Sequence, residues 1–384
     1  MNKYKSLYSK FLKANEGKIH FACHSHHYWP DCTREAQLEY WEDSCKMIDN
    51  KWEYILTEKV GTAQRLLSDH LNFNRPNDIT FAPNTHELVT RILSSFSGKI
   101  KILTTDSEFY SFSRQLNRYI EADLIDATVI PTLPIETFQE RFSKASHEGF
   151  DVVFTSHVFF NSGLAIKDLN LLVEEISKNN STIIIDGYHG FMALPVDLSK
   201  IGDKIFYIAG SYKYVGAGEG CCFMTIPKNC NLRPLNTGWF AEVSTLENVN
   251  DNEVAYPKDG MRFAGSTLDY TALYRLVSVL ELFKEENINS SLIHKHVQEC
   301  QKSFLKILDK INHPHLNRNN LLVDDIDHHG HFLTFNLEST ELVNSIREKL
   351  ESNGVLTDSR KNRLRFGFSL YHDHTEYSEK LFTV

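Results

Sequence analysis

Apolar residues occur along much of the chain in short continuous runs. Amphipathic stretches separate these runs, which lie at 100–103, 152–154, 183–185, 205–208 and 221–226. Continuous apolar runs are typical of strands that are covered on both faces, as in a mostly parallel sheet. The pattern therefore predicts an α/β protein with a mostly parallel sheet.

The two ends of the chain have a different pattern. Helical spacing of apolar positions predicts helices over 34–56 and 60–70. From Leu268 onward, long helical stretches at 268–284 and 291–311 precede short strand patterns at 331–336 and 363–368, with a helix between. This order predicts a smaller α+β unit. We expect an N-terminal segment 1–60 that contributes to the active site and small domain, a large cofactor-binding domain 61–265 and a small domain 266–384.

Composition narrows the class of function. The chain has 384 residues, 41% of them hydrophobic, and a formal net charge of -9 without a long block of one sign. Nucleic acids and anionic membranes select basic surfaces, so a small-molecule ligand is the expected partner. No apolar stretch approaches the length of a membrane span, and the seven cysteines are scattered. We predict a cytoplasmic protein with reduced thiols.

A lysine and an aspartate carry the candidate chemistry. Asp186 closes an apolar run at the position where an open parallel sheet binds ligands, and His189 follows it. Lys213 follows the next run and precedes the glycine-rich stretch 216–220. Pyridoxal phosphate needs a lysine that forms a Schiff base and an acid that faces its pyridine nitrogen. Taken singly, Asp186 could instead cap a turn and Lys213 could be a solvated surface charge.

Several segments resemble those of kynureninase, within the class V aminotransferase superfamily. The strongest are Asp186-Gly187-Tyr188-His189 and Ser211-Tyr212-Lys213-Tyr214. In chain order, further similar segments are 21–30, 84–88, 108–111, 159–163, 238–240 and 364–368. The resemblance implies a pyridoxal phosphate transferase fold of type I, like that of aspartate aminotransferase, with pyridoxal 5'-phosphate as cofactor and an amino acid as substrate.

The resemblance also assigns roles to individual residues. It implies that Lys213, Asp186, His189 and Tyr212 are catalytic. It further implies that these four bind the cofactor together with Thr85, His86, Phe109, Trp239 and Ser266. Thr85 could equally be a plain helix cap, and Phe112 is a second candidate for the ring that stacks on the cofactor. Arg365 would bind the substrate carboxylate; a structural salt bridge is the alternative.

The chain departs from kynureninase at two places. Where that family has a serine-asparagine pair that holds kynurenine, this chain has Ala264-Gly265, so we expect a substrate other than kynurenine. Gly265-Ser266 instead resembles a step that reaches the neighbouring subunit's cofactor phosphate in class V aminotransferases, which implies a homodimer with shared sites.

The second departure is the histidine-rich segment 23–28. A metal could be held there, but neighbouring residues of an extended segment point to opposite faces, so we predict no metal site. We expect Ser25, His26 and His27 to line the substrate pocket.

Two reactions remain open at this point. The first is an aminotransferase-like reaction, and the second is a kynureninase-like hydrolase or lyase reaction at the β-carbon. A cysteine desulfurase is disfavoured because no cysteine follows Cys300. A scaffold that binds the cofactor without catalysis has little support, because the catalytic candidates are all present.

Overall fold

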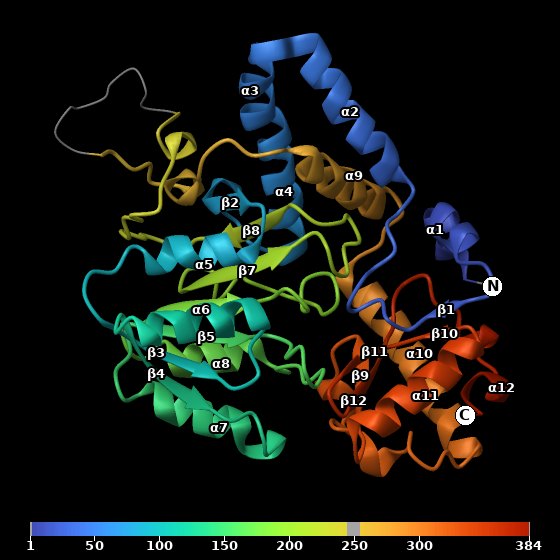
Figure 1. The fold of residues 1–384 in the computed structure, drawn as a ribbon. Coiled ribbons are helices and arrows are strands. Elements are labelled where there is room, and N and C mark those ends of the chain that lie inside the picture. The colour runs from blue at the N-terminus through green and yellow to red at the C-terminus, as the bar shows by residue number, and fades with distance from the viewer. Residues whose placement is uncertain (1, 244–253, 384) are drawn as a thin grey trace.

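The computed structural model describes residues 2–243 and 254–383, and all structural statements concern these residues. A seven-stranded sheet of order β2-β8-β7-β6-β5-β3-β4 forms the centre of the larger body (Figure 1). Its strands are β2 (Ile79–Ala82), β3 (Ile100–Thr105), β4 (Ile125–Ile130), β5 (Val152–Ser156), β6 (Thr182–Asp186), β7 (Ile205–Gly210) and β8 (Cys222–Thr225). Within this sheet β8 runs antiparallel to the other six strands, which are parallel to one another, so the prediction of a mostly parallel sheet is confirmed.

Helices cover both faces of this sheet. They are α4 (Val60–Leu71), α5 (Thr85–Leu93), α6 (Tyr110–Glu121), α7 (Ile135–Ser146), α8 (Leu169–Ile176) and α9 (Thr271–Glu285). On β6, Ile183 and Ile185 belong to one hydrophobic core and Ile184 to another. The apolar run of this strand is continuous because each face packs against its own layer of helices.

A smaller unit is built on the antiparallel sheet β11-β12-β9 (Figure 1). Its elements are β9 (Phe332–Asn336), β10 (Val355–Leu356), β11 (Asp358–Arg360), β12 (Arg363–Gly367), α10 (Ser290–Lys310), α11 (Thr340–Ser352) and α12 (Glu379–Phe382). The N-terminal strand β1 (Ile19–His20) pairs in parallel with β10, and the Phe21 carbonyl accepts from Gly367 N–H at 2.6 Å. The N-terminal segment therefore crosses back onto the small unit.

The helices near the N-terminus differ from the sequence expectation. The predicted helix over 34–56 is interrupted at Ile48, whose φ of 52° lies in the left-handed region. The chain forms α1 (Ser9–Ala14), α2 (Cys32–Met47), α3 (Lys51–Tyr54) and a π-helical turn that continues into α4. As a result, α2 and α3 form a hairpin. This hairpin contacts α9, where the Tyr274 hydroxyl donates to Asp43 of α2 at 2.8 Å.

Among the described helices, none combines the length and the apolar character needed to cross a membrane. The domain boundaries at 60 and 265 stay predictions, as do the homodimer and the cytoplasmic location.

Candidate active site

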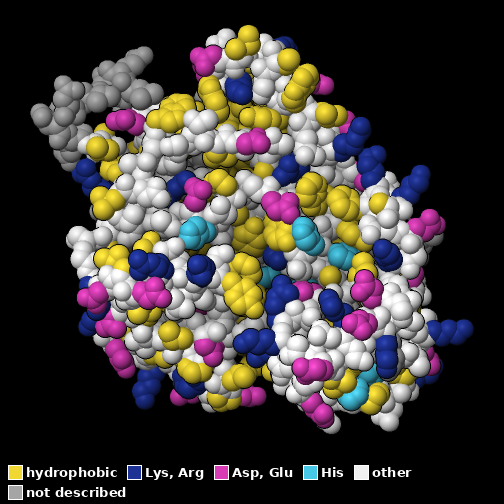
Figure 2. Space-filling model, viewed as in Figure 1, with side chains coloured by type: hydrophobic (Ala, Val, Ile, Leu, Met, Phe, Trp, Pro, Cys, Tyr) yellow, Lys and Arg dark blue, Asp and Glu magenta, His cyan; other side chains and the backbone are white. Residues whose placement is uncertain are grey.

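A cavity of about 520 Å³ opens at the carboxyl ends of the parallel strands, which is the usual ligand position in such sheets. Histidine, lysine and arginine side chains gather around a hollow on the face where the larger body meets the small unit (Figure 2). The cavity is lined by Ser25, Asn84, Thr85, His86, Phe109, Ser111, Ser156, Phe160, Asp186, Tyr188, His189, Tyr212, Lys213 and Arg360. Its volume suits a cofactor together with a small substrate.

Lys213 is held in the turn that follows β7. Its side chain is only 9% exposed, and Nζ donates to the carbonyl of His24 at 2.8 Å and to that of Ser25 at 3.2 Å. Burial lowers the pKa of Lys213 to about 7, and the positive charge of Arg365 adds to this effect. The amine is therefore available as a neutral nucleophile or base near neutral pH.

Asp186 ends β6 and faces the cavity. The Tyr188 N–H donates to its Oδ1 at 2.9 Å, and burial raises the pKa of Asp186 to about 6. The next residue must be glycine, since a Cβ at Gly187 would lie 2.0 Å from Tyr207 Cζ. This sharp turn keeps the carboxylate at the edge of the sheet, where it can accept a hydrogen bond from a ligand.

His189 lies in the same turn and is buried. Its ring centroid is 5.7 Å from that of Phe332 on β9. Burial lowers the pKa of His189 well below its usual value, and Lys213 lowers it further. The imidazole is therefore neutral and can pack against an aromatic ligand or share a proton with it.

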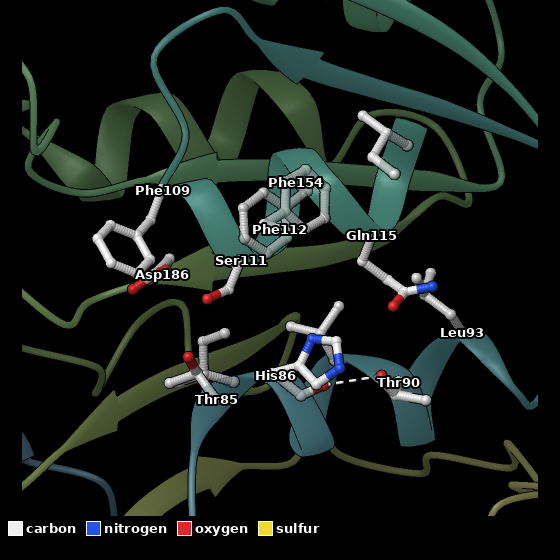
Figure 3. A pocket seen from close by; sticks show the side chains of 13 residues that line it. Thr85, His86, Thr90, Leu93, Phe109, Ser111, Phe112, Gln115, Phe154 and Asp186 are labelled. Atoms are coloured by element: carbon white, nitrogen blue, oxygen red, sulfur yellow. Dashed lines mark hydrogen bonds between the residues drawn. The ribbon is translucent and has the colours of Figure 1, made fainter. Parts of the chain in front are cut away.

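Helix α5 begins at the edge of the cavity. Asn84 is its N-cap, with the Glu87 N–H donating to the Asn84 side chain at 2.9 Å, so Thr85 is the first helical residue and not the cap. Thr85 and His86 face Ser111 and Asp186 across the cavity (Figure 3). Backbone N–H groups at such a helix start bind phosphate well.

The two candidate stacking rings have different surroundings. Phe109 is 44% exposed and lines the cavity, with its ring edge-on to Phe160 at 5.4 Å. Phe112 is buried and stacks on Phe154 at 3.7 Å in the core, as Figure 3 shows. Only Phe109 is placed to cover a ligand ring.

The predicted substrate residues are only partly brought together. Ser25 lines the cavity, and the exposed His26 places its ring 5.3 Å from that of Tyr212, whose hydroxyl donates to the Ser25 carbonyl. His27 is buried away from the cavity, because its Nδ1 donates to the Tyr28 carbonyl at 2.6 Å and its Nε2 accepts from Ser369 at 2.6 Å. His27 therefore packs the small unit and does not line the pocket.

Arg365, Trp239 and Ser266 do not line the cavity. Arg365 is buried and forms an ion pair with Asp358, which is the structural salt bridge considered as the alternative. Trp239 donates from Nε1 to Thr267 at 3.0 Å, beside Ser266. The roles of Trp239 and Ser266, including contact with a neighbouring subunit's cofactor, stay predictions.

Sequence reasoning missed several polar residues at the site, among them Glu108 and Arg360. Glu108 is buried next to Asp186, with its carboxyl 2.7 Å from Thr105 Oγ1 and 2.5 Å from Ser156 Oγ. Burial raises the pKa of Glu108 to about 8. Arg360 lines the cavity from β11 and pairs with Asp358. The available signal was an acid directly before Phe109 and an Asp-x-Arg pattern shortly before the predicted last strand.

The chain is similar to solved structures that share this fold. The cystine C–S lyase C-DES in complex with cysteine persulfide is 18% identical, with a TM-score of 0.78 over 95% of this chain and 96% of that chain. A C-DES mutant with glycine covalently linked to its pyridoxal phosphate cofactor is 17% identical, with a TM-score of 0.78 over 96% of each chain. A cysteine desulfurase from Thermococcus onnurineus NA1 is 16% identical, with a TM-score of 0.75 over 93% of this chain and 91% of that chain. No curated protein sequence is similar enough to count as a match.

A buried lysine and an acid at the carboxyl edge of this sheet, beside an open helix start, define a pyridoxal phosphate-dependent enzyme of fold type I. The family model described as Aminotransferase class-V matches residues 42–359, most of the chain. The chain therefore belongs to the class V aminotransferase family. A particular closeness to kynureninase stays a prediction.

Proposed function

We propose that this enzyme acts on an amino acid by transamination, with Lys213 as the residue that bonds to the cofactor and moves the substrate's α-proton. The observation that carries the proposal is the buried Lys213 amine, with its pKa near 7, in one cavity with Asp186 and the start of α5. Pyridoxal phosphate supplies the electron sink that stabilises negative charge at the substrate α-carbon.

Each end of the cavity fits one part of that cofactor. The α5 N-terminus with Thr85 and His86 would hold the phosphate, and the Asp186 carboxylate would accept a hydrogen bond from the protonated pyridine nitrogen. Phe109 would cover one ring face, with His189 nearby. Tyr212 would orient the substrate side of the pocket from its position against Ser25.

The neutral Lys213 amine would take the substrate's α-proton onto Nζ and hold it there for return during the reaction. The carbonyls of His24 and Ser25 already hold Nζ by hydrogen bonds, so they keep the free amine in place for this proton transfer.

Cleavage at the β-carbon is the second candidate. It is supported by the similarity to C–S lyase structures over 95% to 96% of the chain, and by Tyr212, whose hydroxyl lies at the cavity and could protonate a leaving group. A desulfurase that uses its own cysteine has no such support. Cys23 is buried near Lys213, and burial raises the pKa of its thiol far above neutral.

The first test detects the covalent bond between Lys213 and the cofactor. Purified protein with added pyridoxal phosphate should absorb visible light, and borohydride reduction should place the cofactor on the peptide that contains Lys213. A Lys213→Ala variant should lose both signals. Lys204→Ala is the matched control, because Lys204 is exposed at the start of β7. Wild-type protein that stays colourless would refute the proposal.

The second test separates the two reactions. The enzyme is incubated with a panel of amino acids, with and without a keto-acid acceptor. Keto-acid formation that requires the acceptor supports transamination, whereas pyruvate and ammonia or sulfide released without it indicates β-cleavage.

Kynurenine should be a poor substrate in this panel. A Cβ at Gly265 would lie 2.3 Å from Arg91 Nη2, so the polar pair of kynureninases does not fit at this place. Efficient turnover of kynurenine would show that the chain binds it by other contacts.

A further inference from the structure

A buried glutamate contacts the wall of the cavity through a serine. Ser156 ends β5, lines the cavity and is the register partner of Asp186 at the end of β6. Glu108 lies in the turn between β3 and α6, is 3% exposed and does not line the cavity itself. Its carboxyl group bonds to Ser156, so any effect of Glu108 on a ligand passes through this serine.

The hydrogen bonds of Glu108 show where its carboxyl hydrogen belongs when the group is neutral. Oε1 accepts from Thr105 Oγ1 at 2.7 Å and from the Ser156 N–H at 3.2 Å. Oε2 lies 2.5 Å from Ser156 Oγ. A neutral carboxylic acid has one hydrogen, and Oε1 already accepts two hydrogen bonds, so the hydrogen is placed on Oε2 and faces Ser156 Oγ.

The surroundings of Glu108 favour this neutral form. Burial raises the pKa of Glu108 to about 8, and the negative charge of Asp186 on β6 adds to this effect. The other neighbouring groups are uncharged: Thr105 on β3 and Ser156 on β5 present hydroxyls, and Ser113 on α6 donates to the main-chain carbonyl of Glu108 at 3.2 Å. At neutral pH, Glu108 is therefore a hydrogen-bond donor to Ser156.

The direction of this bond decides what Ser156 offers to a ligand. A hydroxyl group has a single hydrogen. When Ser156 Oγ accepts from neutral Glu108, that hydrogen is free to point into the cavity, which Ser156 lines. An ionised carboxylate can only accept, so an ionised Glu108 would draw the same hydrogen away from the cavity.

The cofactor would bring an acceptor to this side of the cavity. Helix α5, whose start would hold the phosphate, contacts β7 and β8, whereas β5 lies on the far side of β6 in the sheet. In pyridoxal phosphate the ring hydroxyl is on the side of the ring away from the carbon that bears the phosphate branch. With the ring nitrogen at Asp186, the ring oxygen is therefore on the side of Ser156.

We propose that Glu108 is a positioning residue for cofactor binding: as a neutral acid it donates to Ser156 Oγ, and the Ser156 hydroxyl then donates to the ring oxygen of pyridoxal phosphate. This assignment rests on the proposed function, because it requires the cofactor in the cavity beside Lys213 and Asp186.

The test measures binding and not turnover. Two probes are compared by calorimetry on the full chain without cofactor: 4-deoxypyridoxine 5'-phosphate, in which a methyl group replaces the aldehyde, and the same molecule with a hydrogen in place of the ring hydroxyl. At about pH 7, wild-type protein should prefer the first probe, and Ser156→Ala should reduce this preference about 10-fold. Glu108→Gln should keep it, because an amide N–H can donate to Ser156 Oγ as the neutral acid does.

The pH dependence isolates the role of Glu108. Between about pH 7 and about pH 9, the preference of wild-type protein should fall about 10-fold relative to that of Glu108→Gln, whose amide does not ionise. Comparing the two proteins removes the titration of the probe's own hydroxyl. Ser156→Ala should show no fall relative to Glu108→Gln, because the hydroxyl that ionised Glu108 would draw away is missing.

Ser162→Ala is the matched control. Ser162 is also buried, its Oγ accepts from the Leu164 N–H at 3.2 Å and it does not line the cavity, so its preference should equal that of wild type at both pH values. A full preference retained in Ser156→Ala, or a fall with pH that persists in it, would overturn the assignment while the proposed function stands. Failure of both probes to bind wild-type protein would instead refute the proposed function, and the assignment with it.

Discussion

The two walls of the cavity hold carboxyl groups in opposite electrostatic states. On the sheet wall, formed by Asp186 and Glu108 beside the ends of β5 and β6, burial raises the pKa values to about 6 and about 8. On the small-unit wall, formed by β11 and β12, burial also pushes the pKa of Asp358 upward. The contact with His24 and the charges of Arg365 and Arg360 outweigh it and hold this pKa well below its usual range.

The difference indicates which wall is complete before a ligand binds. Asp358 has its cations within the protein, at 2.7 Å in the case of Arg360, and it serves to hold those arginines in place. Among the described residues, only the Tyr188 N–H donates to the Asp186 carboxylate, so a positive ligand atom would complete the surroundings of this group. A cationic ligand atom would thus bind favourably at the sheet wall, beside Asp186. The small-unit wall instead carries a cationic group of its own at the cavity, the guanidinium of Arg360.

The largest effect on stability should come from removing the charge of Asp358 on the small-unit wall. Asp358→Asn leaves buried Arg365 without its partner and should lower the free energy of unfolding by about 3–5 kcal/mol, measured by urea titration. Asp324→Asn is the control, because Asp324 is 74% exposed and its pair with Arg318 should contribute less than about 1 kcal/mol. Equal effects of the two substitutions would remove the contrast between the walls.

A smaller and opposite effect is expected on the sheet wall. Asp186→Asn removes an ionised group that burial disfavours, so the protein without cofactor should keep its stability or gain about 1 kcal/mol. The same change should weaken pyridoxal phosphate binding about 10- to 100-fold, measured by titration of the visible absorbance. A loss of stability as large as that of Asp358→Asn would show that Asp186 has a structural partner.

The smallest effect belongs to Glu108→Gln, which replaces a neutral carboxylic acid by a neutral amide of similar shape. At pH 4, where the carboxyl group is mostly neutral in the unfolded chain as well, the unfolding free energy should change by less than about 1 kcal/mol. In wild type, the stabilisation from neutral Glu108 is complete below its ordinary pKa of 4.5 and is lost as the pH rises through about 8. That loss, up to about 1.4 kcal/mol per pH unit, should disappear in the variant.

Asp186 is present in both proteins and serves as an internal reference for the pH series. Because its pKa is also raised, the free energy of unfolding of both proteins should decline around pH 6. If wild type and Glu108→Gln decline in parallel between pH 6 and 8, then Glu108 is ionised in the folded protein and the sheet wall carries two negative charges.

The sequence predicted the five inner strands of the large sheet and missed its two edge strands, β2 and β4. Strands β3, β5, β6, β7 and β8 were all found from continuous apolar runs. Strand β4 was missed because it lies at the edge of the sheet, where Asp126 and Val129 are exposed and no continuous apolar run is needed. The break at Ile48 was missed because a left-handed residue that is not glycine or asparagine leaves no compositional signal.

The candidate site also has a part that the sequence predicted and a part that it did not. Lys213, Asp186 and His189 follow strands whose ends meet at one edge, so their positions along the chain predicted that they share a cavity. The different surroundings of Arg360 and Arg365 could not be predicted. They depend on the β11–β12 register, which places Asp358 beside Arg365 and leaves Arg360 at the cavity.

The return of the N-terminal segment onto β12 has a consequence for biosynthesis. His27 and Ser369, which share a hydrogen bond, are 342 residues apart, and the His24 carbonyl that holds Lys213 belongs to the same segment. On the ribosome the sheet can form while later residues are still being added, but this wall cannot assemble until β12 has emerged. Stable cofactor loading should therefore require that β12 has emerged, and ribosome-bound chains that end before β12 should fail to retain pyridoxal phosphate.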